Sequence, residues 1–501
     1  MAPGLFRASK GRRLASFFLG LFPLAAAAAT PLPAQVAAEL RESGVPGAAV
    51  AALQAGGPGL AFGVGRRDLL HPEDAVGPDT LFKLGSLSKS VTALAAALLV
   101  EESRLAWDAP LSRWLPELVD ADPRVAGLTL RQLLSHRSGL DLDRLEALLW
   151  PQPNAYTGAD LVAGIAALRS DPREAPGFHY SNVNYALAGL AISRAAGQPF
   201  TRLVAERVFK PLGMDCTMGG FSRADLPDLA QPHRMASGRP EPVRTDPGQV
   251  DEGLDAAAGG LRCSARGLQP WLRYHLSPAG RPPGLSEAGW RELHRAEALV
   301  AHRFAPDDGA LQAMEAYGLG LQFIGDARGL RIDHYGGLAG VAAYLAVDPA
   351  RRSAYAIALN ADAPATRARL MRLVEQVLGL PAPPVRPPRP ASPPAAMPAP
   401  AQSLAPEAAR ALQGRWRDAW FGEVQLCPRD ASLGWRSLAS PRLTGRLVQT
   451  AGGEVQLRWD DPSIQSDARV MRDSDGLRLQ ALGAADFDFS ALRLSRAGDC
   501  P

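Results

Sequence analysis

The pattern of apolar and polar positions divides the chain into a long mixed segment and a shorter segment of a different kind. Near the start, "VPGAAVAALQAGGPGLAFGVG" predicts two strands joined by a Gly/Pro turn. Near residue 350, "GVAAYLAVDPARRSAYAIALNAD" predicts two more, and "TRARLMRLVEQVLGL" predicts a helix after them. Helical composition dominates between the two strand pairs. We therefore expect an α+β fold over residues 35–379, in which both ends of the segment build one antiparallel sheet that helices flank.

The pattern changes after residue 410. Short alternating runs such as "EVQLC", "GRLVQT", "EVQLRW" and "GLRLQAL" are separated by Gly, Pro, Asp and Ser, which predicts a small all-β domain over residues 411–498, an antiparallel barrel or sandwich. Its tryptophans at strand spacing are expected in the barrel core rather than on a ligand platform: Trp416, Trp420, Trp435 and Trp459. The proline-dense residues 380–410 favour extended polyproline II and predict a semi-rigid linker.

The first thirty residues have the composition of a signal peptide. Arg7, Lys10, Arg12 and Arg13 precede the apolar run "LASFFLGLFPL", and small residues suited to cleavage follow. The run is shorter than the roughly 20 residues that a membrane-spanning helix needs. We therefore expect a periplasmic or secreted protein with no stable membrane span after cleavage of residues 1–30. An uncleaved signal anchor is the alternative.

Composition and cysteine content narrow the classes of partner. The 54 basic and 51 acidic residues leave a formal charge of +3, and the arginines are scattered, so we expect no nucleic-acid partner. The cysteines show no metal-ligand spacing, and HExxH is absent, which predicts no metal site. Four cysteines suit an oxidising compartment. A Cys427–Cys500 bridge is a hypothesis, and each of Cys216 and Cys263 is expected to be a disulfide partner or a buried thiol.

Ser86 and Lys89 form the motif on which the chemistry depends. The chain contains only four lysines, and one stands three residues after Ser86 at the start of an alanine-rich helical run. Three residues are nearly one helical turn, so both side chains share a face. A desolvated lysine loses proton affinity and can accept the serine proton, whereas arginine cannot. Ser86 stands where a serine would cap this helix. The alternative is that the serine falls three residues before a lysine by chance.

Two further motifs each occur once. Tyr180 and Asn182 lie in "FHYSNVNYALAGLAI", where a phenol could hold a proton in transit and an amide could orient a substrate carbonyl. The competing interpretation is a helix cap at Asn182 beside a buried aromatic ring. His334 leads into Gly336 and Gly337 in "DHYGGLAGVAAYLAVD". These glycines either bring a strand edge close to a ligand or form a simple turn.

Taken together, Ser86-x-x-Lys89, Tyr180-x-Asn182 and His334-x-Gly336 resemble the class C β-lactamase and penicillin-binding-protein type of serine hydrolase. Stretches such as "VPGAAVA", "LTLRQLLSHRSGL", "FKPLGMDCT" and "YGLGL" extend the resemblance over roughly residues 35–380. It implies an acyl-enzyme mechanism without a cofactor. Ser86 would be the nucleophile, and Lys89 and Tyr180 would share the acid and base work. Asn182, His334, Gly336 and Gly337 would bind substrate, with the N–H groups of Ser86 and Gly337 as oxyanion hole.

His334 departs from the lysine usual in β-lactamases and D-Ala-D-Ala peptidases of this type. Histidine is largely neutral near pH 7 and is a poorer partner for a substrate carboxylate. We therefore predict hydrolysis of a small-molecule ester or of a D-amino-acid or cell-wall type amide, in the manner of esterase and D-aminopeptidase branches. The alternatives are a true β-lactamase or D-Ala-D-Ala carboxypeptidase, and a non-catalytic protein that binds penicillin or peptidoglycan.

Overall fold

A computed structural model describes residues 30–54, 57–168, 177–219, 221–222, 228–236, 238–243, 249–250, 253–304, 311–381, 401–430, 432–461, 464, 467–474, 476–482 and 489–501. The predicted signal peptide, apart from Thr30, and most of the predicted linker lie outside these residues. By its internal contacts the chain divides into the units Met1–Pro31 and Leu32–Pro501. The helices and strands described below belong to the second unit. Within the described part of the chain, every helix is too short or too polar to span a bilayer.

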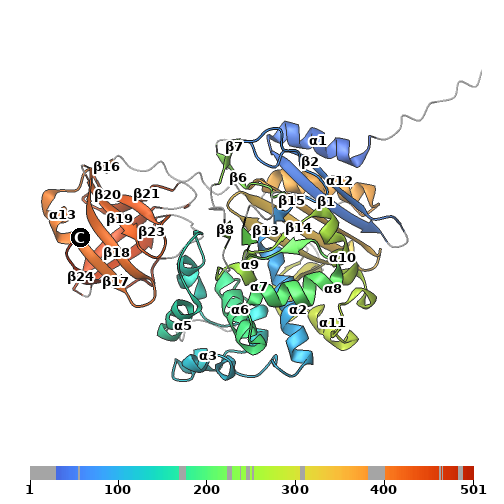
Figure 1. Ribbon diagram of the computed structural model, residues 1–501, viewed down its shortest axis with the longest axis horizontal. Coiled ribbons are helices and arrows are strands. Elements are labelled where there is room, and N and C mark those ends of the chain that lie inside the picture. The colour runs from blue at the N-terminus through green and yellow to red at the C-terminus, as the bar shows by residue number, and fades with distance from the viewer. Residues whose placement is uncertain are drawn as a thin grey trace, which may run out of the picture. The chain divides into compact units, whose positions relative to one another are not determined.

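The larger sheet has eight strands in the order β10-β11-β12-β13-β14-β15-β1-β2. All neighbours run antiparallel, and β1 from the start of the segment pairs with β15 from its end, with Val50 opposite Ile357. The predicted sheet built from both ends is therefore confirmed (Figure 1). Its strands are β1 Gly47–Gln54, β2 Leu60–Gly65, β10 Ala298–Phe304, β11 Leu311–Tyr317, β12 Gln322–Asp326, β13 Gly329–Leu338, β14 Val341–Asp348 and β15 Ser353–Leu359.

Burial on both faces explains why the central strands are almost continuously apolar. In β1, Ala48, Val50 and Ala52 pack on one face with α1 Leu32–Ser43 and α12 Pro364–Val377, which lie side by side (Figure 1). The alternate residues of β1 face the larger core, where α10 Ala265–Leu276 packs. Helix α12 is where the sequence predicts it, whereas α1 is not among the predicted elements.

The helical middle is built around α2 Ser88–Glu101, in which every residue from Ser88 to Leu99 is buried. Its small alanines let α6 Asn182–Ala196 and α9 Ala256–Gly259 pack against it. The other helices are α3 Pro123–Ala126, α4 Leu130–Leu134, α5 Gly158–Ala167, α7 Phe200–Val204, α8 Lys210–Leu212 and α11 Glu287–Leu293, with short 3-10 or π turns η1 Gly85–Leu87, η2 Leu111–Arg113, η3 Pro116–Leu118, η4 Leu142–Leu148, η5 Ala205–Phe209 and η6 Pro278–Gly280. Short strands complete this part: β3 Phe82–Lys83, β4 Cys216–Thr217, β5 Phe221–Ser222, β6 His233–Ala236, β7 Arg239–Pro242, β8 Gln249–Val250 and β9 Arg262–Cys263.

The C-terminal strands form a nearly closed antiparallel barrel in the order β23-β22-β21-β20-β19-β18-β17-β24. A bridge between Leu477 and Leu494 joins its two ends. Trp416, Trp420 and Trp435 are buried and Trp459 is partly buried, so the expected core role is confirmed. The strands are β17 Gly414–Asp418, β18 Gly422–Arg429, β19 Ser432–Ser437, β20 Thr444–Thr450, β21 Val455–Trp459, β22 Ala468–Asp473, β23 Gly476–Ala481 and β24 Ser495–Gly498.

The barrel begins earlier than the proline pattern suggests. Within the predicted linker, β16 Ala401–Gln402 pairs with β20 and α13 Pro406–Leu412 precedes β17. Pro406 stands at the first helical position, where its missing N–H costs nothing, so a proline-rich composition does not exclude a helix there.

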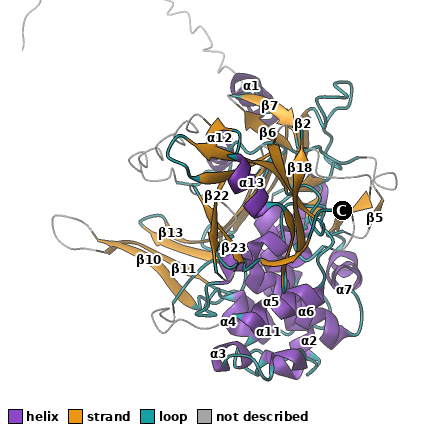
Figure 2. Cartoon of the chain, turned by 90° about the vertical axis from the view of Figure 1, so that its left-hand side faces the viewer, coloured by secondary structure: helices purple, strands orange, loops and turns teal. Residues whose placement is uncertain are grey.

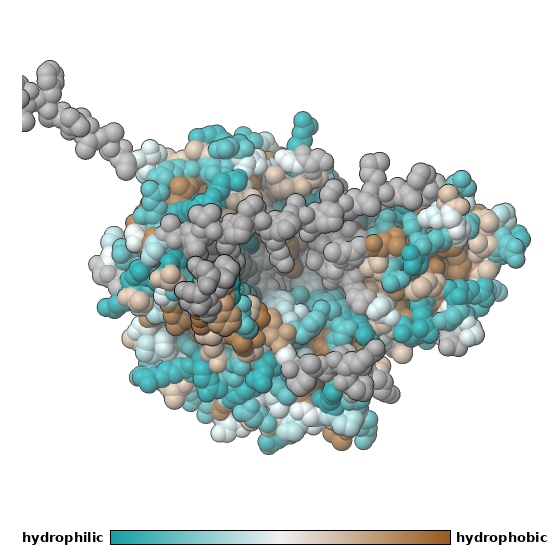
Figure 3. Space-filling view, turned by 180° about the vertical axis from the view of Figure 1, so that it is seen from behind, coloured by the Kyte–Doolittle hydropathy of each residue, from teal (hydrophilic) through white to brown (hydrophobic). Residues whose placement is uncertain are grey.

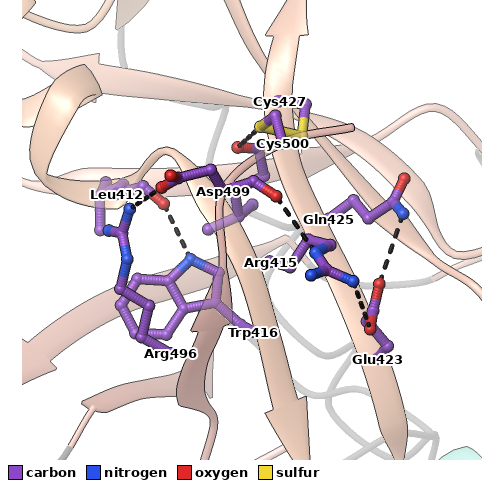
Figure 4. The surroundings of a disulfide bond; sticks show 10 residues. Leu412, Arg415, Trp416, Glu423, Gln425, Cys427, Arg496, Asp499 and Cys500 are labelled. Atoms are coloured by element: carbon purple, nitrogen blue, oxygen red, sulfur yellow. Dashed lines mark hydrogen bonds and ion pairs between the residues drawn. A yellow bond between two sulfur atoms is a disulfide. The ribbon is translucent and has the colours of Figure 1, made fainter.

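Two disulfides lie in the described part of the chain. Cys427 of β18 bonds to Cys500, as hypothesised, and ties the chain end to the barrel beside Trp416 (Figure 4). Cys216 and Cys263 stand opposite one another in β4 and β9 and form the second. On the face shown in Figure 3, hydrophilic and apolar residues are interspersed. Strands β10 and β11 extend from the sheet as a ribbon (Figure 2).

Candidate active site

Ser86 lies in η1, the turn that leads from β3 into α2. Gly85 before it has φ +54, a left-handed conformation that glycine adopts without strain. The residue at the N-cap of α2 is Leu87, and it makes no side-chain cap. The interpretation of Ser86 as a helix cap is therefore wrong, because the 3-10 turn turns its hydroxyl toward other side chains.

Lys89 is fully buried in the first turn of α2, and its Nζ is held by three oxygens. It lies 3.0 Å from Ser86 Oγ, 2.7 Å from Asn182 Oδ1 and 3.0 Å from the carbonyl oxygen of Ala258. Burial lowers the pKa of Lys89 to about 7, although the nearby Glu146 acts to raise it. Near neutral pH a substantial fraction of this lysine is thus the free amine, which can accept a proton from Ser86.

Tyr180 approaches the same hydroxyl from the other side. Its phenol donates a 2.8 Å hydrogen bond to Ser86 Oγ, and its ring centroid lies 4.8 Å from Lys89 Nζ. Burial raises the pKa of Tyr180 far above its usual value, and the hydrogen bond to Ser86 only partly opposes that rise. The phenol therefore keeps its proton across the physiological range, which suits it to donate rather than to accept.

Asn182 opens α6, directly after Tyr180 in the chain. Ser181 holds the N-cap position without a side-chain cap, so the alternative of a cap at Asn182 is also wrong. The Asn182 amide oxygen accepts from Lys89, and its backbone N–H donates to Glu146 Oε1 over 2.9 Å. In this arrangement the oxygen of the Asn182 side chain is bonded to Lys89. The predicted role of Asn182 in binding substrate stays a prediction.

His334 is buried in β13, and both of its ring nitrogens have partners. Nδ1 lies 2.7 Å from the carbonyl oxygen of Tyr335 and Nε2 lies 2.9 Å from the hydroxyl of Tyr317. Because a carbonyl can only accept, Nδ1 carries the hydrogen and Nε2 accepts from Tyr317. Burial, together with the charge of Lys89, lowers the pKa of His334 to about 3. The ring is therefore neutral, as expected from the sequence.

The glycines after His334 bring β13 against the nucleophile turn. A Cβ on Gly336 would lie 2.0 Å from the carbonyl oxygen of Leu84, and a Cβ on Gly85 would lie 3.0 Å from the backbone nitrogen of Gly337. Gly337 itself is exposed, with open space where a side chain would begin. The backbone N–H of Gly337 is thereby held next to the residue that precedes Ser86, where the oxyanion hole is expected.

Three residues of the site have no role in the sequence analysis. Tyr317 ends β11 and holds His334, and Glu146 of η4 holds the start of α6. His136 has φ +56, its ring centroid lies 4.2 Å from that of Tyr180, and its Nδ1 accepts from the N–H of Ser181. Tyr317 lies in "YGLGL" and His136 in "LTLRQLLSHRSGL", two stretches that resemble the family, so the resemblance could have pointed to them. Glu146 lies in no such stretch.

Within the residues that the structure describes, one group combines three metal-ligand side chains. Asp141, Asp143 and His179 bring ligand atoms within 4.8 Å of one another. Asp143 Oδ2 already pairs with His179 Nε2 at 2.8 Å, and Asp141 pairs with Arg144. These pairings explain the cluster without an ion.

A serine between a buried lysine and a phenol, at the edge of a helix-covered antiparallel sheet, is the arrangement of a serine hydrolase that works without a separate histidine base. The family model described as Beta-lactamase matches residues 32–379, and the chain belongs to that family of serine hydrolases. Esterase EstB of Burkholderia gladioli is 38% identical over 200 residues, which cover 36% of this chain and 48% of EstB.

Solved structures share the fold. A class C beta lactamase from Rhodobacter sphaeroides matches with a TM-score of 0.55 and 23% identity, over 70% of this chain and 99% of that one. The crystal structure of SurE matches with the same TM-score and identity, over 93% of this chain and 98% of that chain. The predicted β-lactamase-type α+β fold with an appended barrel is therefore confirmed.

Proposed function

We propose that this protein hydrolyses carboxylic esters of small molecules through an acyl-enzyme at Ser86. The observation that carries the proposal is His334, a buried, neutral ring between Tyr317 and the Tyr335 carbonyl. A β-lactam or a C-terminal D-alanine presents a carboxylate, and a neutral imidazole offers it no permanent cation. An ester needs no such partner. The similarity to an esterase supports the same choice.

The proposed reaction has two halves. Ser86 Oγ attacks the ester carbonyl carbon as its proton passes to the free amine of Lys89, 3.0 Å away. The tetrahedral oxyanion faces the N–H groups of Ser86 and Gly337. When the intermediate collapses, the alcohol leaves with a proton from Tyr180, which regains one from the Lys89 ammonium. Water then attacks the acyl-enzyme, Lys89 takes its proton, and the acid departs as Ser86 is reprotonated.

The test is intact-protein mass spectrometry with a fluorophosphonate, benzylpenicillin and a p-nitrophenyl ester, combined with steady-state rates. We expect one fluorophosphonate adduct per chain and steady ester turnover, both lost in Ser86→Ala. Ser432→Ala, in barrel strand β19, serves as the matched control and should keep both. A cephalosporin hydrolysed far faster than short esters would identify a β-lactamase instead. A stable benzylpenicillin adduct without turnover of the ester would identify a penicillin- or peptidoglycan-binding protein.

We also propose that the enzyme is exported, on the composition of residues 1–30. The two disulfides agree with an oxidising compartment. Intact mass of protein from the periplasm or medium of an expressing bacterium should correspond to cleavage near residue 30. A full-length mass in the membrane fraction would indicate an uncleaved anchor.

A further inference from the structure

Glu146 is a buried carboxyl group that the proposed reaction does not use. It lies in η4, between two apolar neighbours of the core, and only 5% of its surface is exposed. A carboxyl group is costly to bury unless its oxygens are satisfied. The hydrogen-bond partners of Glu146 therefore indicate its role in the structure.

Among the described residues, the side chain of Glu146 accepts hydrogen bonds from Asn182, which begins α6, and from Ser181 just before it. Oε1 accepts from the backbone N–H of Asn182 over 2.9 Å and from Ser181 Oγ at 3.5 Å, and Oε2 faces Asn182 Nδ2 at 3.5 Å. Helix α6 has no cap from its own N-cap residue. Glu146 thus caps this helix from another part of the chain and is favoured there by the helix dipole.

The same contacts fix the direction of the Asn182 amide. With Nδ2 toward Glu146, the other end of the amide, Oδ1, is 2.7 Å from Lys89 Nζ. A flipped amide would turn its N–H donors toward Lys89, and the lysine would lose the acceptor that holds it. The position of Asn182 beside Glu146 therefore bears on which amide atom Lys89 contacts.

The protonation of Glu146 is coupled to that of Lys89. The charged groups that act on Glu146 are Lys89 from α2 and Asp143 from its own turn. Burial and Asp143 raise the pKa of Glu146 to about 8, against the lowering effects of Asn182 and Lys89. Because this pKa lies above that of Lys89, about 7, Glu146 is largely the neutral acid where the lysine exchanges its proton.

We propose that Glu146 is a positioning residue for Lys89: it holds the start of α6 so that the oxygen of the Asn182 amide faces the lysine. The inference rests on the proposed role of Lys89 as the base for Ser86. It adds a fourth side chain, from η4, to the cluster formed by the serine, lysine and asparagine.

Glu146→Gln keeps an oxygen for the Asn182 N–H, as the neutral acid does. Its kcat and its kcat/KM profile for a p-nitrophenyl ester should therefore stay within several-fold of those of the unaltered enzyme. Glu146→Leu, which removes that acceptor, should fall at least tenfold further in kcat. Asp141→Asn, a carboxylate on the same segment, is the control and should leave the profile in place.

Equal kcat for the Gln and Leu variants would overturn the inference. If Glu146→Leu fails to fold, judged by circular dichroism, Glu146→Gln decides: a loss of tenfold or more in kcat would overturn the inference. Failure of the proposed function is recognised separately, because the unaltered enzyme would then take no fluorophosphonate at Ser86.

Discussion

The Asn182 amide oxygen lies 2.7 Å from Lys89 Nζ, closer than the 3.0 Å that separate that nitrogen from Ser86 Oγ. The lysine is thus held from two sides, and with a third contact to a carbonyl oxygen it cannot swing away from the serine. A nucleophile and base that are preorganised in this way avoid reorganisation during the reaction.

Replacing Lys89 by arginine should abolish proton acceptance while keeping the positive charge. Guanidinium does not lose its proton in proteins, so we expect kcat/KM for a p-nitrophenyl ester to fall by about 10²–10⁴-fold. Lys210→Arg, at an exposed lysine that begins α8, is the matched control and should have little effect. Ester turnover by Lys89→Arg at the unaltered rate would exclude the lysine as base.

The rate should follow the protonation of Lys89. Because the pKa of this lysine is lowered to about 7 and only its neutral form accepts a proton, kcat/KM should rise with pH through about 7. Below that point it should fall about tenfold for each pH unit. A neutral ester substrate keeps its own titration out of the profile. A rate that is flat between pH 5 and 7 would contradict this assignment.

His334 should remain neutral throughout the range in which the enzyme is assayed. Its pKa is lowered to about 3, chiefly by burial, so its ring should stay in the form with hydrogen on Nδ1 between pH 5 and 8. Nitrogen-15 NMR of histidine-labelled enzyme, with His334→Gln to assign the signals, measures this directly. An imidazolium signal at pH 5.5 that disappears in the variant would contradict the neutral site.

Gly336 should tolerate no side chain, because a Cβ there would lie 2.0 Å from the Leu84 carbonyl oxygen. We expect Gly336→Ala to push β13 away from the nucleophile turn and to lower kcat/KM by about 10²-fold, the effect of an ångström-scale misplacement. Gly325→Ala on the neighbouring strand β12 has only the Met314 carbonyl oxygen within reach, at 4.0 Å, and should stay active. Similar activities for the two variants would show that this close contact is not needed.

The Cys427–Cys500 bond should stabilise the barrel. It closes a loop with a sequence separation of 73 residues, and the double variant Cys427→Ser/Cys500→Ser should lose about 4 kcal/mol of unfolding free energy. Urea unfolding followed by the fluorescence of the buried tryptophans measures this loss. Peptide mapping without reductant should recover the cross-linked peptide, and recovery of both cysteines as free thiols would contradict the pairing.

The residue pattern alone predicted the layer architecture and the candidate residues of the site. The alternating and continuous apolar runs are local consequences of burial on one or both faces of a sheet, so they predicted β1, β14, β15 and the barrel strands before any contact was known. The spacing Ser86-x-x-Lys89 is likewise local, since one helical turn fixes it.

The side chains that surround Ser86 and Lys89 follow from the tertiary structure and not from the local sequence. Glu146, Tyr317 and His136 reach the site across large sequence separations, and nothing in the chain near Glu146 distinguishes it from a surface carboxylate. The neutral state of His334 and the lowered pKa of Lys89 arise from desolvation, which depends on the whole packed core. Local pattern thus indicated the candidate reacting groups, whereas long-range packing set their partners and protonation.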